Sequence, residues 1–212
     1  MKKRLIVLTV LSFVILNCLN SQYKCKYRMN KLDEFTNTNV VATRYNILVA
    51  KMFPLSLLNT MFYVDVSVDM EYTAKDTTFY LFINFHNNTI GQDDEADCIS
   101  KDNKIVFVMS DKEIITLQDT KNYKGKKSEG TVVAGVVTSW QSEVAGSYLI
   151  TKEAYRSLLN KSITKCRIEV MNGKDGTETK NYDFDILKNQ TLIMDQLNCV
   201  LQKFNPKTEA NE

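Results

Sequence analysis

The sequence predicts a mainly β or α+β protein, built on an antiparallel sheet or a β-sandwich. Apolar and polar side chains alternate throughout 62–72, as they do in a long strand with one buried face. The same alternation recurs at 77–86 and 164–171. Helical spacing is confined to a short helix near 151–160 and to a C-terminal helix, which we expect to pack on the sheet.

Residues 1–21 have the layout of a secretory signal peptide. Lys2, Lys3 and Arg4 precede an apolar run at 5–16, which is too short to cross about 30 Å of hydrocarbon as a helix. We therefore expect residues 1–21 to be cleaved. The mature chain would then be exported to the periplasm or the outer envelope, or be secreted.

Two processing schemes compete for this leader. Cleavage after Ser21 leaves a soluble chain that starts at Gln22. In the alternative, Ile15-Leu16-Asn17-Cys18 is a lipobox, and Cys18 is acylated and becomes the first residue of a lipoprotein. Asn17 departs from the small residue usual before that cysteine, so the soluble product is our first expectation.

The mature chain is expected to be nearly neutral. Without the three cations of the leader, 24 of the 27 basic residues remain against 25 acidic residues, which gives a net charge near −1. A nucleic-acid binder would carry a strongly basic patch. We therefore expect no nucleic-acid partner, and a membrane contact only through a lipid on Cys18.

One domain is the simplest organisation for the mature chain. About 190 residues are enough to bury a core, and with seven Gly and two Pro in the whole sequence no linker divides them. We distinguish a polar N-terminal segment, 22–39, a single β-rich domain, 40–205, and a disordered tail, 206–212.

The first half of this domain is predicted to contain three strands. A turn at 33–37 leads into a strand over 40–53, which Pro54 ends because proline has no N–H for a β-ladder. A hairpin loop at 74–76 then joins the two alternating strands. The acidic row of the first alternating strand is expected to face solvent.

The second half is predicted from shorter patterns. In order, these are a hairpin over 104–109 and 113–118, a valine-rich buried strand over 131–140, a short strand at 148–150, a helix capped by Thr151, a hairpin over 164–171 and 182–186 around a turn at 172–176, and a helix that begins near Asn189.

Either processing scheme leaves four cysteines, because Cys18 is removed or consumed by lipid. Cys25, Cys98, Cys166 and Cys199 allow up to two disulfides in three connectivities, with free, half-buried thiols as the alternative. Their wide spacing, without a C-x-x-C pair, argues against a zinc site. Cys166 to Cys199 is our first choice for a bridge, if the C-terminal helix covers the hairpin that contains Cys166.

No metal or cofactor motif is present in the sequence. Acidic side chains at Asp93, Asp94, Glu95 and Asp97 are hard oxygen ligands of the kind that Ca²⁺ prefers. The D-x-D-x-D-G spacing of a calcium loop is absent, however. We expect a solvated acidic loop there, no metal site and no cofactor.

Catalytic groups are scarce. His86 is the single histidine, so any Ser-His or Cys-His nucleophile must use it. Asp183 and Asp185 lie about 7 Å apart along a strand, a separation that an inverting glycosidase could use. Such pairs are usually solvated, and we assign no catalytic residue.

Two short motifs resemble small exported bacterial proteins of unknown function. One is the run Tyr148-Leu-Ile-Thr-Lys-Glu with Leu158 and the later Ile163-Thr-Lys-Cys-Arg-Ile; the other is Asp33-Glu-Phe-Thr near the mature N-terminus. Cys166 within the second strand departs from that pattern. The resemblance implies export and the same fold class, and it does not indicate a function.

These observations lead to a functional hypothesis. We expect an exported, non-catalytic envelope protein that presents a β-scaffold to an unknown protein or small ligand. The alternative is a subunit of an envelope assembly, with Tyr63 and Tyr80 as exposed contacts. An extracytoplasmic hydrolase is the less favoured alternative.

Overall fold

The computed structural model describes residues 23–55, 58–90, 96–129, 132–133, 136–137, 139–171 and 178–204. These residues form a large seven-stranded sheet, a small four-stranded sheet, a two-stranded hairpin and two helices. The large sheet contains β1 (Tyr27–Asp33), β2 (Thr38–Thr43), β3 (Asn46–Leu55), β4 (Leu58–Tyr72), β5 (Thr77–Ile90), β8 (Lys126–Glu129) and β11 (Ser139–Ile150). The small sheet contains β6 (Lys104–Met109), β7 (Ile114–Gln118), β12 (Ile163–Met171) and β13 (Thr179–Asp185), and the helices are α2 (Lys152–Asn160) and α3 (Leu192–Phe204).

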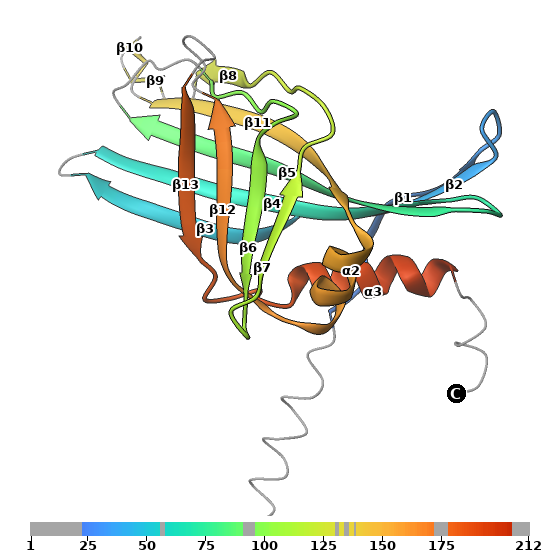
Figure 1. Ribbon diagram of the computed structural model, residues 1–212. Coiled ribbons are helices and arrows are strands. Elements are labelled where there is room, and N and C mark those ends of the chain that lie inside the picture. The colour runs from blue at the N-terminus through green and yellow to red at the C-terminus, as the bar shows by residue number, and fades with distance from the viewer. Residues whose placement is uncertain are drawn as a thin grey trace, which may run out of the picture.

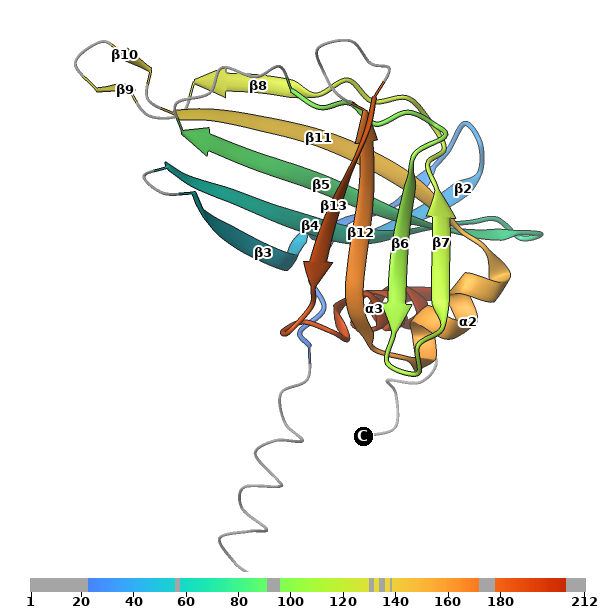
Figure 2. The same ribbon diagram turned by 60° about the vertical axis from the view of Figure 1, so that its left-hand side comes forward.

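The two sheets pack face to face with their strands crossing steeply (Figures 1 and 2). All the strand pairs are antiparallel. The inner face of the large sheet meets the small sheet and both helices, and the core fills the space between them. The predicted class is confirmed: a mainly β protein with a C-terminal helix packed on a sheet.

The hairpin of β4 and β5 is the centre of the large sheet. Every second residue of β4 from Val64 to Met70 is fully buried, as the alternation predicted. The strands pair from Met61 with Asn88 to Tyr72 with Thr77, around the predicted turn. Burial of this apolar row contributes on the order of 1.5–3 kcal/mol for each large side chain.

The helices close one end of the core. Thr151 caps α2, and its Oγ1 accepts a hydrogen bond from the Ala154 N–H at 3.3 Å. Helix α3 packs on β4, β2 and α2 (Figure 1). Among the described residues, neither helix is long and apolar enough to cross a membrane.

Two strand predictions were wrong. Valines of the expected strand at 131–140 form a separate small hairpin of β9 (Val132–Val133) and β10 (Val136–Val137). The long strand is β11, whose first half is polar and alternates too weakly to be recognised. Pro54 does not end β3. Among the described strands β3 pairs only with β4, and a proline at a sheet edge breaks no ladder.

The sheet also begins earlier than the sequence pattern indicated. β1 lies inside the segment that was expected to be polar and turn-rich, and it pairs with β2. The turn at 33–37 connects these two strands, with Asn37 in the left-handed region at φ 51°. The expected turn at 172–176 and the acidic residues 93–95 lie outside the described residues.

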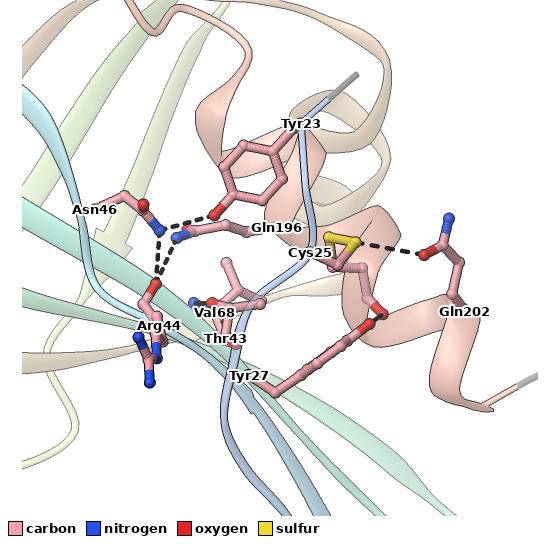
Figure 3. Close-up of a disulfide and its surroundings, with 10 residues drawn as sticks. Tyr23, Cys25, Tyr27, Thr43, Arg44, Asn46, Val68, Gln196 and Gln202 are labelled. Atoms are coloured by element: carbon pink, nitrogen blue, oxygen red, sulfur yellow. Dashed lines mark hydrogen bonds between the residues drawn. A yellow bond between two sulfur atoms is a disulfide. The ribbon is translucent and has the colours of Figure 1, made fainter. Parts of the chain in front are cut away.

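The disulfide differs from our first choice. Cys199 of α3 bonds to Cys25, just before β1, and not to Cys166 (Figure 3). Cys166 does face inward, but its strand is in the small sheet, whereas Cys199 faces the N-terminal segment. Cys98 and Cys166 are free.

Asp119 ties the loop after β7 to the edge of β11. Its carboxylate accepts hydrogen bonds from the Lys121 N–H at 2.9 Å and the Ser147 N–H at 3.0 Å. Gly146 makes this approach feasible, since a Cβ there would lie 2.8 Å from Asp119 Oδ2. Burial raises the pKa of Asp119 from 3.8 to about 6, although the backbone N–H groups oppose that shift.

We expect Asp119 to make the protein less stable as pH rises. Its raised pKa means that the folded chain holds a proton that the unfolded chain releases, so this contribution is complete below pH 3.8 and is lost as pH rises to about 6. Between pH 3.8 and about 6, the free energy of unfolding of the unsubstituted protein should fall by about 2–3 kcal/mol relative to that of Asp119→Asn. Urea unfolding of both chains at several pH values measures this. A difference that does not change with pH, or that grows with pH, would contradict the assignment.

Candidate functional site

A cavity of about 880 Å³ opens at the edge of the large sheet, where β2 gives way to β3. We call it the edge pocket. Its walls come from the segment before β1, the start of β3, the middle of β4 and the loop that enters α3. Its lining residues are Tyr23, Tyr45, Asn46, Ile47, Asp65, Leu187, Lys188, Asn189, Gln190, Thr191, Leu192 and Asp195. A volume of this size is typical of small-molecule sites.

The pocket exists because the edge of the large sheet is interrupted. β2 and β3 pair with the same edge of β4, one after the other. Thr43 fills the junction: its Oγ1 accepts a hydrogen bond from the Val68 N–H at 2.9 Å and donates one to the Val68 carbonyl at 3.2 Å. Arg44 and Tyr45 then cross the gap between the two strands.

One wall of the pocket is the loop between β13 and α3. Asn189 has φ 59°, a left-handed conformation that asparagine tolerates. Its Nδ2 donates a hydrogen bond to the Ile47 carbonyl at 2.9 Å, which holds the loop against β3. The Ile163 N–H donates to the Gln190 carbonyl at 2.9 Å. The loop is therefore fixed to both sheets.

The side-chain amides of Asn46 and Gln196 form hydrogen bonds that hold the wall of the pocket in place (Figure 3). Asn46 Nδ2 donates hydrogen bonds to the Tyr23 hydroxyl at 2.7 Å and to the Arg44 carbonyl at 2.8 Å. Gln196 of α3 is fully buried, and its Nε2 donates to the carbonyls of Arg44 and Val66 at 3.2 and 3.0 Å. These bonds satisfy carbonyls that the interrupted sheet edge would leave unpaired.

The pocket combines carboxylates, phenol rings and apolar side chains. Asp65 and Asp195 bring two negative charges, against one positive charge from Lys188. Tyr23 and Tyr45 are half-buried, and burial raises the pKa of both phenols. At the rim, Ile47 is 51% exposed and Leu187 is 86% exposed.

Asp65 connects the pocket to the single histidine. His86 Nε2 lies 3.5 Å from Asp65 Oδ2, and its Nδ1 lies 4.0 Å from Glu143 Oε2. Tyr63 stacks on the imidazole with ring centroids 4.1 Å apart. Burial raises the pKa of Asp65, and His86 opposes this only in part. Both nitrogens of His86 therefore face carboxylates, an arrangement unlike a nucleophile–base pair.

The acidic row of β4, which was expected to face solvent, does so only in part: Glu71 is exposed, Asp65 is half-buried and Asp69 is buried. Asp69 is only 7% exposed and forms an ion pair with Arg28 at 2.7 Å. The Arg28 guanidinium also lies over the rings of Tyr45 and Phe82, at 5.2 and 5.8 Å from the centroids. Arg28 therefore covers this part of the sheet and packs over one face of the Tyr45 ring.

The other residues considered from sequence lie away from the edge pocket. Asp183 forms a two-point ion pair with Arg167 at 2.6 and 2.9 Å, which lowers the pKa of Asp183. Asp185 lies 3.6 Å from Lys165. Both acids line a smaller cavity of about 440 Å³ on the small sheet. A lowered pKa is the wrong direction for a general acid of a glycosidase.

The predicted assembly contacts are engaged within their own sheet. Tyr63 and Tyr80 are half-buried, with Tyr63 stacked on His86 and Tyr80 tilted against Phe82 at 6.4 Å between centroids.

Burial raises the pKa of the Cys166 thiol, so that thiol stays protonated. In the described part of the chain, no group of three or more His, Cys, Asp or Glu side chains is placed to share a metal ion.

Sequence patterns could not reveal the edge pocket. Its walls come from residues far apart in the chain, and three of them, Tyr23, Asn46 and Asn189, have no local pattern that marks them. The signal that was available is the polar Arg44-Tyr45-Asn46 run inside the expected strand at 40–53. It now marks the break between β2 and β3.

Comparison of the chain with protein-family models, with curated proteins and with solved structures finds no match.

Proposed function

We propose that this protein is an exported, non-catalytic scaffold of the cell envelope that binds a ligand in the edge pocket. The ligand class that fits best carries a protonated amine beside an apolar body. The observation that carries the proposal is Asp65, a half-buried carboxylate on the pocket wall. Among the described residues, His86 is the only basic side chain within 4.0 Å of it.

Electrostatics favour a cation at this wall. Moving a carboxylate out of water costs free energy, which a charged partner returns in part. The raised pKa of Asp65 results mainly from this loss of hydration. A bound amine would stabilise the charged form of Asp65, and the second acid, Asp195, leaves the pocket with a net negative charge.

The remaining lining accounts for an apolar body. The face of a tyrosine ring attracts cations and packs against hydrocarbon, and Tyr23 and Tyr45 supply two such rings. Exposed Ile47 and Leu187 add apolar surface at the rim. Pockets of this type orient a ligand with a few polar groups and hold it by apolar contact.

Export is supported by two independent features. The disulfide between Cys25 and Cys199 belongs to an oxidising compartment. The layout of residues 1–21 is that of a signal peptide. Acylation of Cys18 remains the alternative to cleavage after Ser21.

A matched series of probes tests the ligand class. Phenethylamine, phenethyl alcohol and 3-phenylpropionate share an aromatic body and differ in charge. We expect the amine to bind most tightly, by about tenfold over the alcohol, because a half-buried ion pair contributes about 1 kcal/mol or more. Asp65→Asn should weaken amine binding by about fivefold to tenfold, as measured by calorimetric or NMR titration.

Asp185→Asn is the matched control, since it removes an exposed carboxylate of the small sheet. It should leave the Kd of the amine unchanged. Equal affinity for the three probes, or an equal loss in both variants, would refute the proposal. Circular dichroism checks that each variant is folded.

A further inference from the structure

We infer that the basic residues around the Cys25–Cys199 disulfide form a docking face for an anionic phospholipid membrane. The inference rests on the proposed export of the chain. It goes beyond the expectation that only a lipid on Cys18 would contact a membrane. We call this surface the disulfide face, and it comprises Lys24, Lys26 and Arg44.

The N-terminal segment is fastened to α3, so its exposed side has a fixed orientation. Cys25 is bonded to Cys199, and the Tyr27 hydroxyl donates a hydrogen bond to the Cys199 carbonyl at 2.9 Å. Figure 3 shows Tyr23, Cys25 and Tyr27 directed toward α3 and the start of β3. Side chains alternate in an extended chain, and Lys24 and Lys26 are exposed on the opposite side.

One further cation joins them from another part of the chain. The Arg44 N–H donates a hydrogen bond to the Lys26 carbonyl at 2.8 Å, which places Arg44 beside this segment. All three side chains belong to exposed residues.

These charges are not neutralised within the protein. Among the described residues, no carboxylate lies within 4.0 Å of any of the three cations. Arg28, Lys161 and Arg167 elsewhere do form ion pairs. The disulfide face thus has a local positive charge on a nearly neutral chain.

The position of Cys18 favours a membrane as the occupant. Cys25 lies seven positions after Cys18, and an extended chain over seven positions spans at most about 25 Å. Acylation of Cys18 would therefore hold the disulfide face close to the bilayer. Without acylation, the same three cations remain a salt-sensitive membrane contact.

Vesicle co-sedimentation tests this inference without an acyl chain. The full chain with Cys18→Ser is expressed with its leader, purified after export, and mixed with phosphatidylcholine vesicles with or without phosphatidylglycerol. We expect binding to the anionic vesicles at low salt, and its loss at high salt. Lys24→Gln with Lys26→Gln should lower the partition coefficient by roughly 25-fold, at about fivefold for each cation.

Lys101→Gln with Lys104→Gln is the matched control. Both lysines are exposed. β6 begins at Lys104, at the end of the small sheet remote from the helices (Figure 2). This pair should leave the partition coefficient unchanged. Equal binding to both kinds of vesicle, or an equal loss in both double variants, would overturn the docking face. The amine titration of the pocket is a separate measurement, so the two proposals can fail independently.

Discussion

Replacing Cys25 and Cys199 together with serine is expected to lower the free energy of unfolding by about 3–5 kcal/mol. The bond joins residues 174 positions apart, so it restricts nearly the whole unfolded chain. It also fastens the segment before β1 to α3, which positions Tyr23 on the pocket wall. The double variant should therefore lose both stability and amine binding.

Urea unfolding of the oxidised protein measures this effect. The native chain should first be shown by intact mass to be two hydrogens lighter than its reduced form. Cys98→Ser is the matched control, because Cys98 is half-buried and free, and it should cost less than about 1 kcal/mol. A double variant as stable as Cys98→Ser would show that the bond does not hold the fold together.

Gln196→Leu is expected to cost about 2–4 kcal/mol of folding free energy. Leucine keeps most of the volume, but it removes both hydrogen bonds from Nε2 to the carbonyls of Arg44 and Val66. A buried polar group left without its partner costs about 1–3 kcal/mol. The break between β2 and β3 would lose its main support from α3, so amine binding in the edge pocket should weaken as well.

The control for this substitution lies two residues away on the same helix. Asn198 is exposed, so Asn198→Leu should change the free energy of unfolding by about 0.5 kcal/mol or less. Urea unfolding of both variants gives the comparison. Equal stability of the two variants would show that the buried amide does not stabilise the junction between β2 and β3.

Strands with a regular pattern could be predicted from the sequence. The row from Val64 to Met70 alternates because one face is buried, and burial is a property of each residue type. Thr151 could be placed as a cap because its hydroxyl serves a neighbouring N–H. In these elements local chemistry and tertiary packing agree.

Features that depend on distant partners could not be predicted in the same way. Asp65 and Asp69 belong to the same alternating row of β4. Asp69 is nevertheless covered by Arg28 from β1, whereas Asp65 lines a pocket. The partner of Cys199 depends on which surface α3 covers, and helix α3 covers β2 and β4. The edge pocket itself requires Asn189 to bond to Ile47, 142 residues away in the chain.

We propose the edge pocket as the binding site of an amine-bearing ligand. Amide chemical-shift mapping during titration with phenethylamine tests it most directly. We expect the largest shifts at Tyr23, Asn46, Ile47, Asn189 and Asp195, with the rest of the large sheet unaffected. Shifts centred on the smaller cavity at Arg167 and Asp183, or no localised shifts at millimolar amine, would contradict the claim.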